Sequence, residues 1–207
     1  MDSGWNHSSD PCEAKWTGIV CHDENLSVKS ITFDSFNLSG TFNPSFICNI
    51  ASLATSIVVI SIKNNNLHAD NLESIANCNQ LTHLYVSGNR FVGNLPEAFS
   101  RLNNLKRLEI SDNGFSGDLP SLSRISGLIE FLAQNNRFSG SIPEFDFSNL
   151  ANFNVSNNNF SGKVPPGMLD YVATHCQTSV EFWETNTHLR LKPRMIRKRR
   201  GQIGLKS

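Results

Sequence analysis

Residues 105–120 read LKRLEISDNGFSGDLP, and this stretch decides the fold because the chain repeats it. Three stretches match it position by position, and two weaker copies precede them. The three close copies are LTHLYVSGNRFVGNLP (81–96), LIEFLAQNNRFSGSIP (128–143) and LANFNVSNNNFSGKVP (150–165); the weaker ones are VKSITFDSFNLSGTFN (28–43) and IVVISIKNNNLHADNL (57–72). The copies start 22 to 29 residues apart. Such a period is typical of a solenoid, whose repeats bury their apolar faces by stacking on one another.

Each copy begins with the pattern of a short strand. Leu105, Leu108 and Ile110 occupy its inward positions and alternate with polar residues. Asn113 follows, and its counterparts in the other copies are Asn65, Asn89, Asn136 and Asn158. Because an asparagine amide both donates and accepts hydrogen bonds, a stacked column of them satisfies the backbone groups of each bend. We therefore read these asparagines as part of the scaffold.

The second half of each copy turns the chain back toward the next strand. A phenylalanine stands two residues after the asparagine in the four close copies, and we expect these rings to stack along the convex side of the core: Phe91, Phe115, Phe138 and Phe160. Glycine then permits a tight turn, and proline prevents a regular helix. The sequence predicts an α/β repeat solenoid with short parallel strands and a mostly irregular or 3₁₀-helical convex side.

The repeats resemble a known family. The runs at 37–40 (NLSG), 115–120 (FSGDLP) and 138–143 (FSGSIP) resemble the L-S-G-x-I-P signature of plant-specific leucine-rich repeats. The segments at 5–12 (WNHSSDPC) and 16–21 (WTGIVC) resemble the cap that opens the ectodomains of plant leucine-rich repeat receptor-like kinases. This resemblance implies a leucine-rich repeat horseshoe segment and a disulfide bond between Cys12 and Cys21.

The resemblance also suggests how the chain is divided. We expect a partial N-terminal cap at 1–27, about six repeats at 28–167, and a degenerate C-terminal cap with a disordered basic tail at 168–207. Relatives in this family have a signal peptide, a membrane helix and a kinase domain. The sequence shows no apolar leader, no membrane span and no kinase motif. We therefore expect a truncated gene product, a fragmentary gene model or a splice form of such a receptor.

Composition excludes several other function classes. Residues 1–189 hold ten basic against 18 acidic residues, so the body of the chain gives no reason to expect nucleic-acid binding. No C-x-x-C pair occurs and the six histidines are scattered, so we expect no metal and no cofactor. We expect no catalytic residues. The five cysteines leave the pairing of Cys48, Cys78 and Cys176 open.

A solenoid presents its strands as a concave binding surface. The strand positions of the middle repeats that should face solvent are therefore the candidate contacts for a peptide or protein partner, such as another leucine-rich repeat receptor kinase. These are Thr82, His83, Tyr85, Lys106, Arg107, Glu109, Asp112, Glu130, Leu132 and Gln134.

Five N-x-S/T sequons predict glycosylation: Asn6, Asn25, Asn37, Asn154 and Asn159. Their use requires the secretory pathway. A glycan on Asn154, which the register places on the concave side, would direct partners toward the middle repeats.

Two functions fit this pattern. One is the extracellular ligand-binding module of a receptor-like kinase, located at the cell surface. The alternative is a secreted inhibitor of cell-wall hydrolases, like the polygalacturonase inhibitors, which use the same repeat. Those inhibitors usually have more repeats, so the short array favours the receptor module.

Overall fold

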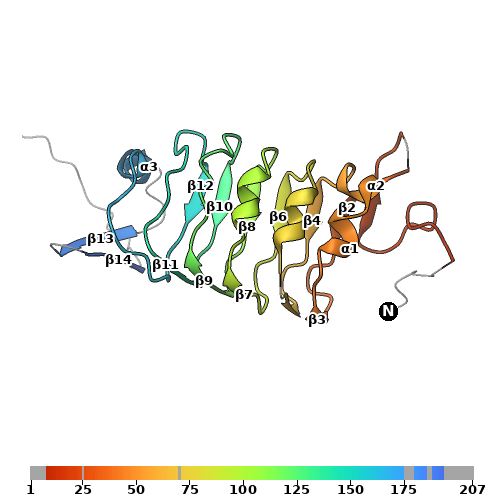
Figure 1. Cartoon of the computed structure of the whole chain (residues 1–207), viewed down its shortest axis with the longest axis horizontal. Coiled ribbons are helices and arrows are strands. Elements are labelled where there is room, and N and C mark those ends of the chain that lie inside the picture. The colour runs from red at the N-terminus through yellow and green to blue at the C-terminus, as the bar shows by residue number, and fades with distance from the viewer. Residues whose placement is uncertain (1–7, 25, 70, 175–179, 186–187, 194–207) are drawn as a thin grey trace, which may run out of the picture.

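The computed structural model describes residues 8–24, 26–69, 71–174, 180–185 and 188–193. A seven-stranded sheet runs along the stacked repeats in the order β1-β2-β4-β6-β8-β10-β12, and α3 (Met168–Thr174), β13 (Val180–Thr185) and β14 (His188–Pro193) lie beyond its last strand (Figure 1). Strand β1 is antiparallel to β2, and all other neighbours are parallel. The strands are β1 (Ile19–Cys21), β2 (Val28–Thr32), β4 (Val59–Ser61), β6 (His83–Tyr85), β8 (Arg107–Glu109), β10 (Glu130–Leu132) and β12 (Asn152–Asn154).

The repeats form parallel strands because every copy places an apolar residue at the same point of the register. Ile60 pairs with Leu84, which pairs with Leu108 and then with Phe131. All four side chains are completely buried. Their neighbours in each strand face the other way, as the alternation of a strand requires. The predicted solenoid of stacked repeats is confirmed.

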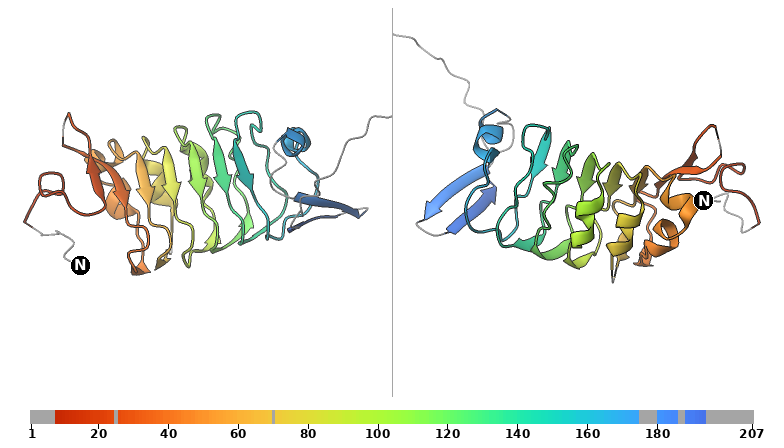
Figure 2. Two further views of the ribbon diagram at one scale, coloured as in Figure 1. Left: turned by 180° about the vertical axis from the view of Figure 1, so that it is seen from behind. Right: turned by 45° about the horizontal axis from the view of Figure 1, so that its top comes forward.

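Short strands follow one edge of the large sheet and short helices cover one of its faces, as Figures 1 and 2 show. Strand β3 (Ser39–Thr41) pairs with β5 (Asn66–His68), and β7 (Val92–Asn94), β9 (Gly114–Asp118) and β11 (Arg137–Ser139) form a three-stranded sheet. The convex side carries α1 (Ser45–Cys48), α2 (Ala51–Ala54) and two 3₁₀ helices, η1 (Glu73–Asn77) and η2 (Glu97–Arg101). This mixture matches the predicted convex side.

The asparagine column forms a ladder of hydrogen bonds. Asn113 Nδ2 donates to the carbonyls of Ser111 at 2.9 Å and of Val86, in the preceding repeat, at 3.1 Å. Asn113 Oδ1 accepts from the Phe91 amide at 3.1 Å. Asn65, Asn89, Asn136 and Asn158 make the equivalent bonds. Each side chain thus ties its own bend to the repeat before it, as predicted.

The phenylalanine column is also confirmed. Phe91, Phe115, Phe138 and Phe160 lie with successive ring centroids 6.0, 6.0 and 6.2 Å apart and ring planes within 13° of parallel. All four rings are buried. Offset stacking of this kind adds to the stabilisation that apolar burial provides.

Two disulfide bonds lie in the N-terminal half. Cys12 pairs with Cys21, which confirms the expectation from the family resemblance. Cys48 at the end of α1 pairs with Cys78 directly after η1, and both are buried. The repeats bring these two cysteines together on the convex side, although 30 residues separate them in the sequence. Cys176 lies outside the described residues.

The segment after residue 167, where we expected a degenerate C-terminal cap, begins with a helix. Helix α3 (Met168–Thr174) covers the end of the last repeat, with Met168 and Tyr171 buried. The Tyr171 ring lies 5.9 Å from Phe147 and 6.2 Å from Phe153, so aromatic packing holds the helix in place. Beyond it, β13 (Val180–Thr185) and β14 (His188–Pro193) form an antiparallel pair. The basic run from Arg194 lies outside the described residues.

Candidate functional site

The outward side chains of the middle strands form two columns on the concave face. One column contains His83, Arg107 and Glu130, and the second contains Tyr85, Glu109 and Leu132, because these residues share registers in β6, β8 and β10. Parallel strands lie about 4.8 Å apart. The sequence-predicted residues of the three strands therefore lie side by side.

A polar network crosses these strands. Arg107 Nη1 lies 3.8 Å from Glu130 Oε1, and Asn152 Nδ2 donates to Glu130 Oε2 at 2.7 Å. Lys63 Nζ lies 3.7 Å from Glu109 Oε2 and 4.8 Å from the centroid of the Tyr85 ring. The network thus extends from the repeat of β4 to β12.

The cations of this network are more accessible than the carboxylates. The side chains of Arg107 and Lys63 are 47% and 31% exposed, whereas those of Glu109 and Glu130 are 20% and 9% exposed. A partner that approaches this face therefore meets positive charge first, with the compensating carboxylates beneath.

Burial changes the acid–base behaviour of the network. It raises the pKa of Glu109, where the nearby Lys63 opposes the shift and Glu130 reinforces it. It lowers the pKa of His83, and the positive charge of Arg107 lowers it further. It also raises the pKa of Tyr85. His83 is therefore mainly neutral near pH 7.

Two of the predicted contacts need correction. Glu130 lies on the concave side, but it is buried rather than solvent-facing, because Arg107 and Asn152 enclose its carboxylate. Asp112 is exposed but lies in the turn after β8, with φ of +55°, rather than on the strand. Its Oδ1 accepts a hydrogen bond from Asn135 Nδ2 at 2.6 Å.

The remaining predicted contacts lie at the margins of the strands. Thr82 precedes β6, and its hydroxyl donates to the Val58 carbonyl at 3.0 Å. Lys106 precedes β8 and is exposed, while Leu132 and Gln134 are half-buried in and after β10. Sequence reasoning missed Lys63 and Asn152. Lys63 belongs to a weak copy of the repeat, but its position, two residues after the last strand residue, could have identified it.

The sequons occupy different environments. Asn37 and Asn159 are exposed and lie outside the helices and strands, while Asn154 is half-buried at the end of β12. Asn154 Oδ1 accepts hydrogen bonds from the amide and hydroxyl of Ser156 at 3.1 and 2.8 Å. Asn6 and Asn25 lie outside the described residues. Glycosylation of the five positions stays a prediction.

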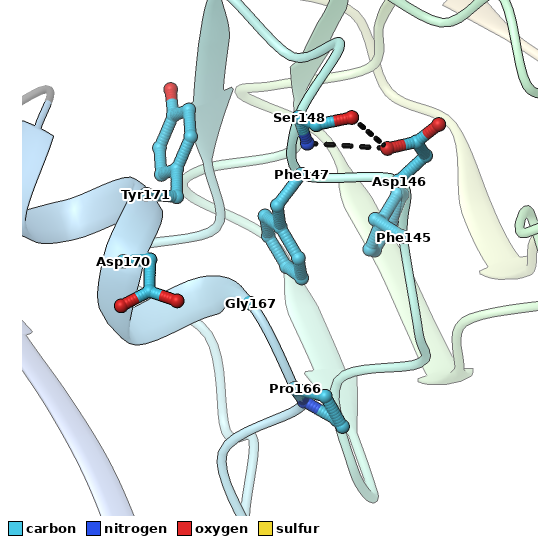
Figure 3. Close-up of a pocket in the computed structure, with 8 residues that line it drawn as sticks. All are labelled: Phe145, Asp146, Phe147, Ser148, Pro166, Gly167, Asp170 and Tyr171. Carbon is cyan, nitrogen blue, oxygen red and sulfur yellow. Dashed lines mark hydrogen bonds between the residues drawn. The ribbon is translucent and has the colours of Figure 1, made fainter.

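A recess of about 550 Å³ lies at the C-terminal end, between the 145–148 loop and α3 (Figure 3). The Asp146 carboxylate in its wall accepts hydrogen bonds from the amide and hydroxyl of Ser148 at 3.2 and 2.5 Å, so it serves to shape the loop. None of the predicted contact residues lines this recess. The concave face is therefore the better candidate.

In the described part of the chain, no helix has the length and apolar character needed to span a membrane.

Comparison with known proteins gives consistent matches. The Leucine Rich Repeat family profile matches residues 80–102, 104–124 and 149–170. Pollen receptor-like kinase 2 of Arabidopsis thaliana is 32% identical over 154 residues, which are 72% of this chain and 22% of that protein. The ectodomain of the A. thaliana receptor kinase SOBIR1 superposes with a TM-score of 0.66 at 32% identity, covering 79% of this chain and 91% of that ectodomain.

The ectodomain of the Arabidopsis receptor kinase HAESA, solved in complex with an N-terminally extended IDA peptide hormone ligand, superposes with a TM-score of 0.61. The two chains are 30% identical, and the match covers 79% of this chain and 29% of that one. This chain spans no more than 22% of the length of the curated relatives that it matches.

The stacked strands, the asparagine ladder and the capped N-terminal end define a leucine-rich repeat solenoid. More specifically, the chain belongs to the ectodomains of the plant leucine-rich repeat receptor-like kinases.

Proposed function

We propose that the chain is the extracellular recognition module of a receptor-like kinase, and that its concave face binds a peptide or protein partner. The observation that carries this proposal is the polar network on β6, β8 and β10, where Tyr85 and Arg107 lie in adjacent strands. Tyrosine and arginine are the residue types that most often dominate binding energy at protein interfaces. The module acts by binding and contributes no catalytic step.

Two further observations support this proposal. Disulfide bonds persist in oxidising compartments, so the pairs Cys12–Cys21 and Cys48–Cys78 fit an extracellular location. The related HAESA ectodomain was solved with a peptide ligand, which makes a peptide a reasonable partner class for this chain.

A displayed random-peptide library tests the proposal without knowledge of the natural ligand. Peptides selected on the full chain should bind the double variant Tyr85→Ala/Arg107→Ala at least about tenfold more weakly, since hot-spot truncation typically reduces binding by 2 kcal/mol or more. The matched control is Glu97→Ala/Arg101→Ala in η2 on the convex side. Selected peptides that bind both double variants as well as the original chain would place recognition elsewhere.

A further inference from the structure

The charges around Tyr85 are arranged in two levels. Lys63 and Arg107 belong to the repeats on either side of Tyr85 and are the more exposed groups. Glu109 and Glu130 lie beneath them and neutralise them at 3.7 and 3.8 Å. Both distances exceed those of charge-assisted hydrogen bonds, which are usually 2.7–2.9 Å. The two cations therefore keep donors that an incoming oxygen atom can use.

A third donor lies beside these cations. Ser87 follows Tyr85 by two residues and is in register with Lys63, because the Asn64 amide donates to the Ser87 carbonyl at 2.9 Å. Ser87 is only 8% exposed, and its hydroxyl has no hydrogen-bond partner among the described residues. A buried hydroxyl without a partner is unfavourable. This oxygen is itself buried, so an acceptor atom of a ligand can pair with it only when the side chains that cover it move.

The Glu109 carboxylate of this cluster can lose its charge by binding a proton. Glu109 interacts with Lys63 from the repeat of β4 and with Glu130 on β10, and it is in register with Tyr85 on β6. Arg107 lies two residues before it on β8, and His83 is in register with Arg107. The partial burial of Glu109 and the adjacent Glu130 carboxylate both favour the protonated form, whereas Lys63 favours the ionised form. One proton from solvent converts the four-charge cluster from neutral to a net charge of +1.

These observations, taken with the proposed function on which this step rests, lead to one inference. We propose that the concave face binds an anionic group of its ligand between Lys63 and Arg107, and that proton uptake by Glu109 strengthens this binding. When Glu109 is ionised, it competes with the ligand for Lys63. When it is protonated, that competition ends and Lys63 is available to the ligand.

The test uses a probe whose own charge does not change with pH. The pentapeptide acetyl-Gly-Gly-cysteic acid-Gly-Gly-amide carries a sulfonate that stays ionised, and the same peptide with serine is its neutral control. The chain has two tyrosines, so ring-labelled tyrosine gives one NMR signal at the site, from Tyr85, and one at the far end, from Tyr171. Titration should shift the Tyr85 signal and leave the Tyr171 signal in place.

The sulfonate peptide should bind about fivefold more tightly at about pH 4.5 than at about pH 7, the factor expected for neutralising a unit charge about 6 Å away at a largely solvated surface. Glu109→Gln should show the tighter binding already at neutral pH and lose the pH dependence. Glu97→Gln, an exposed carboxylate on the convex η2, should keep it. Lys63→Gln should bind the probe weakly at both pH values.

Equal affinity at the two pH values, or a Glu109→Gln variant that keeps the original pH dependence, would overturn the inference. Failure of the sulfonate peptide to bind at either pH would also overturn it. The library-selected peptides would still test the proposed function separately. Acetyl-tetraglycyl-taurine, which carries the sulfonate at its chain end, shows whether a side-chain or a chain-end anion is the better ligand.

Discussion

The hydroxyl of Tyr171 donates a hydrogen bond to the carbonyl of Ala151 at 3.3 Å. Within the array, the equivalent carbonyl always accepts from the following repeat: Ile129 O, for example, accepts from the Ala151 amide at 2.8 Å. Tyr171 therefore supplies, from a helix, the bond that a seventh repeat would have supplied from a strand. This explains how the sixth repeat ends the sheet without leaving that acceptor unpaired.

Removing this hydroxyl should weaken the end of the array. Tyr171→Phe should lower the free energy of unfolding by about 0.5–1.5 kcal/mol, the usual contribution of one hydrogen bond. Tyr171→Ala, which also removes the ring from Phe147 and Phe153, should lower it by about 3–5 kcal/mol. Urea unfolding measures both, with the exposed Leu169→Ala as control. Equal stability of Tyr171→Phe and the original chain would show that the bond is unimportant.

The asparagine ladder should be sensitive to the loss of a single side chain. Asn136 Oδ1 accepts from the Phe115 amide at 3.0 Å, and its Nδ2 donates to the Ile110 carbonyl at 2.9 Å. Asn136→Ala leaves both backbone groups without these partners and should lower the free energy of unfolding by about 2–4 kcal/mol. The exposed Asn103→Ala should change it by less than about 0.5 kcal/mol. Thermal unfolding that fails to separate the two variants would contradict the role given to the ladder.

The titration of His83 should report the charge of Arg107. Burial lowers the pKa of His83, and Arg107 lowers it further, while Glu130 raises it. Arg107→Ala removes a repulsive positive charge and leaves Glu130 in place, so the pKa of His83 should rise. NMR titration of the imidazole carbon-bound protons measures this pKa directly. A pKa that stays constant or falls in the variant would mean that Arg107 does not face the imidazole.

Glu109 should make the fold less stable as the pH rises. Its pKa in the folded chain is raised, chiefly by burial, so the folded chain holds this proton at pH values where the unfolded chain has released it. The loss of unfolding free energy that Glu109 causes is absent below its pKa in the unfolded chain. It develops between the unfolded and folded pKa values and is complete above the folded pKa. Glu109→Gln should therefore gain stability relative to the original chain across this window. Parallel unfolding midpoints for the two proteins from acid to neutral pH would refute this expectation.

Much of the fold follows from positions that recur in every repeat. Asn113 and Phe115 could be assigned from sequence because each stands in a column whose other members have the same surroundings. Cys48 and Cys78 could not be paired, since the sequence does not show how far α1 and η1 lie apart on the convex side. Helix α3 was missed because it lies outside the period.

The candidate site was predicted less completely than the fold. Register alone places Tyr85 and Arg107 on the concave face, but it does not reveal which charges neutralise one another. The burial of Glu130 depends on the lengths and directions of Arg107 and Asn152, which belong to neighbouring repeats. Lys63 enters the network from a repeat whose sequence departs from the consensus. The side-chain contacts between repeats therefore cannot be predicted from the periodicity of the sequence.

The Cys48–Cys78 bond makes the two ends of the array respond differently to mechanical tension. It joins the convex segments that flank β4, and every described contact between repeats on the C-terminal side of Cys78 is noncovalent. Because each repeat contacts mainly its neighbours, tension applied from the C-terminal side should peel the repeats off one after another. Peeling should pause at Cys78, because the residues between Cys48 and Cys78 cannot be extended without breaking a covalent bond. Strands β10, β8 and β6 of the recognition surface would then be lost before the disulfide-closed repeat of β4, and a reducing agent would remove this protection.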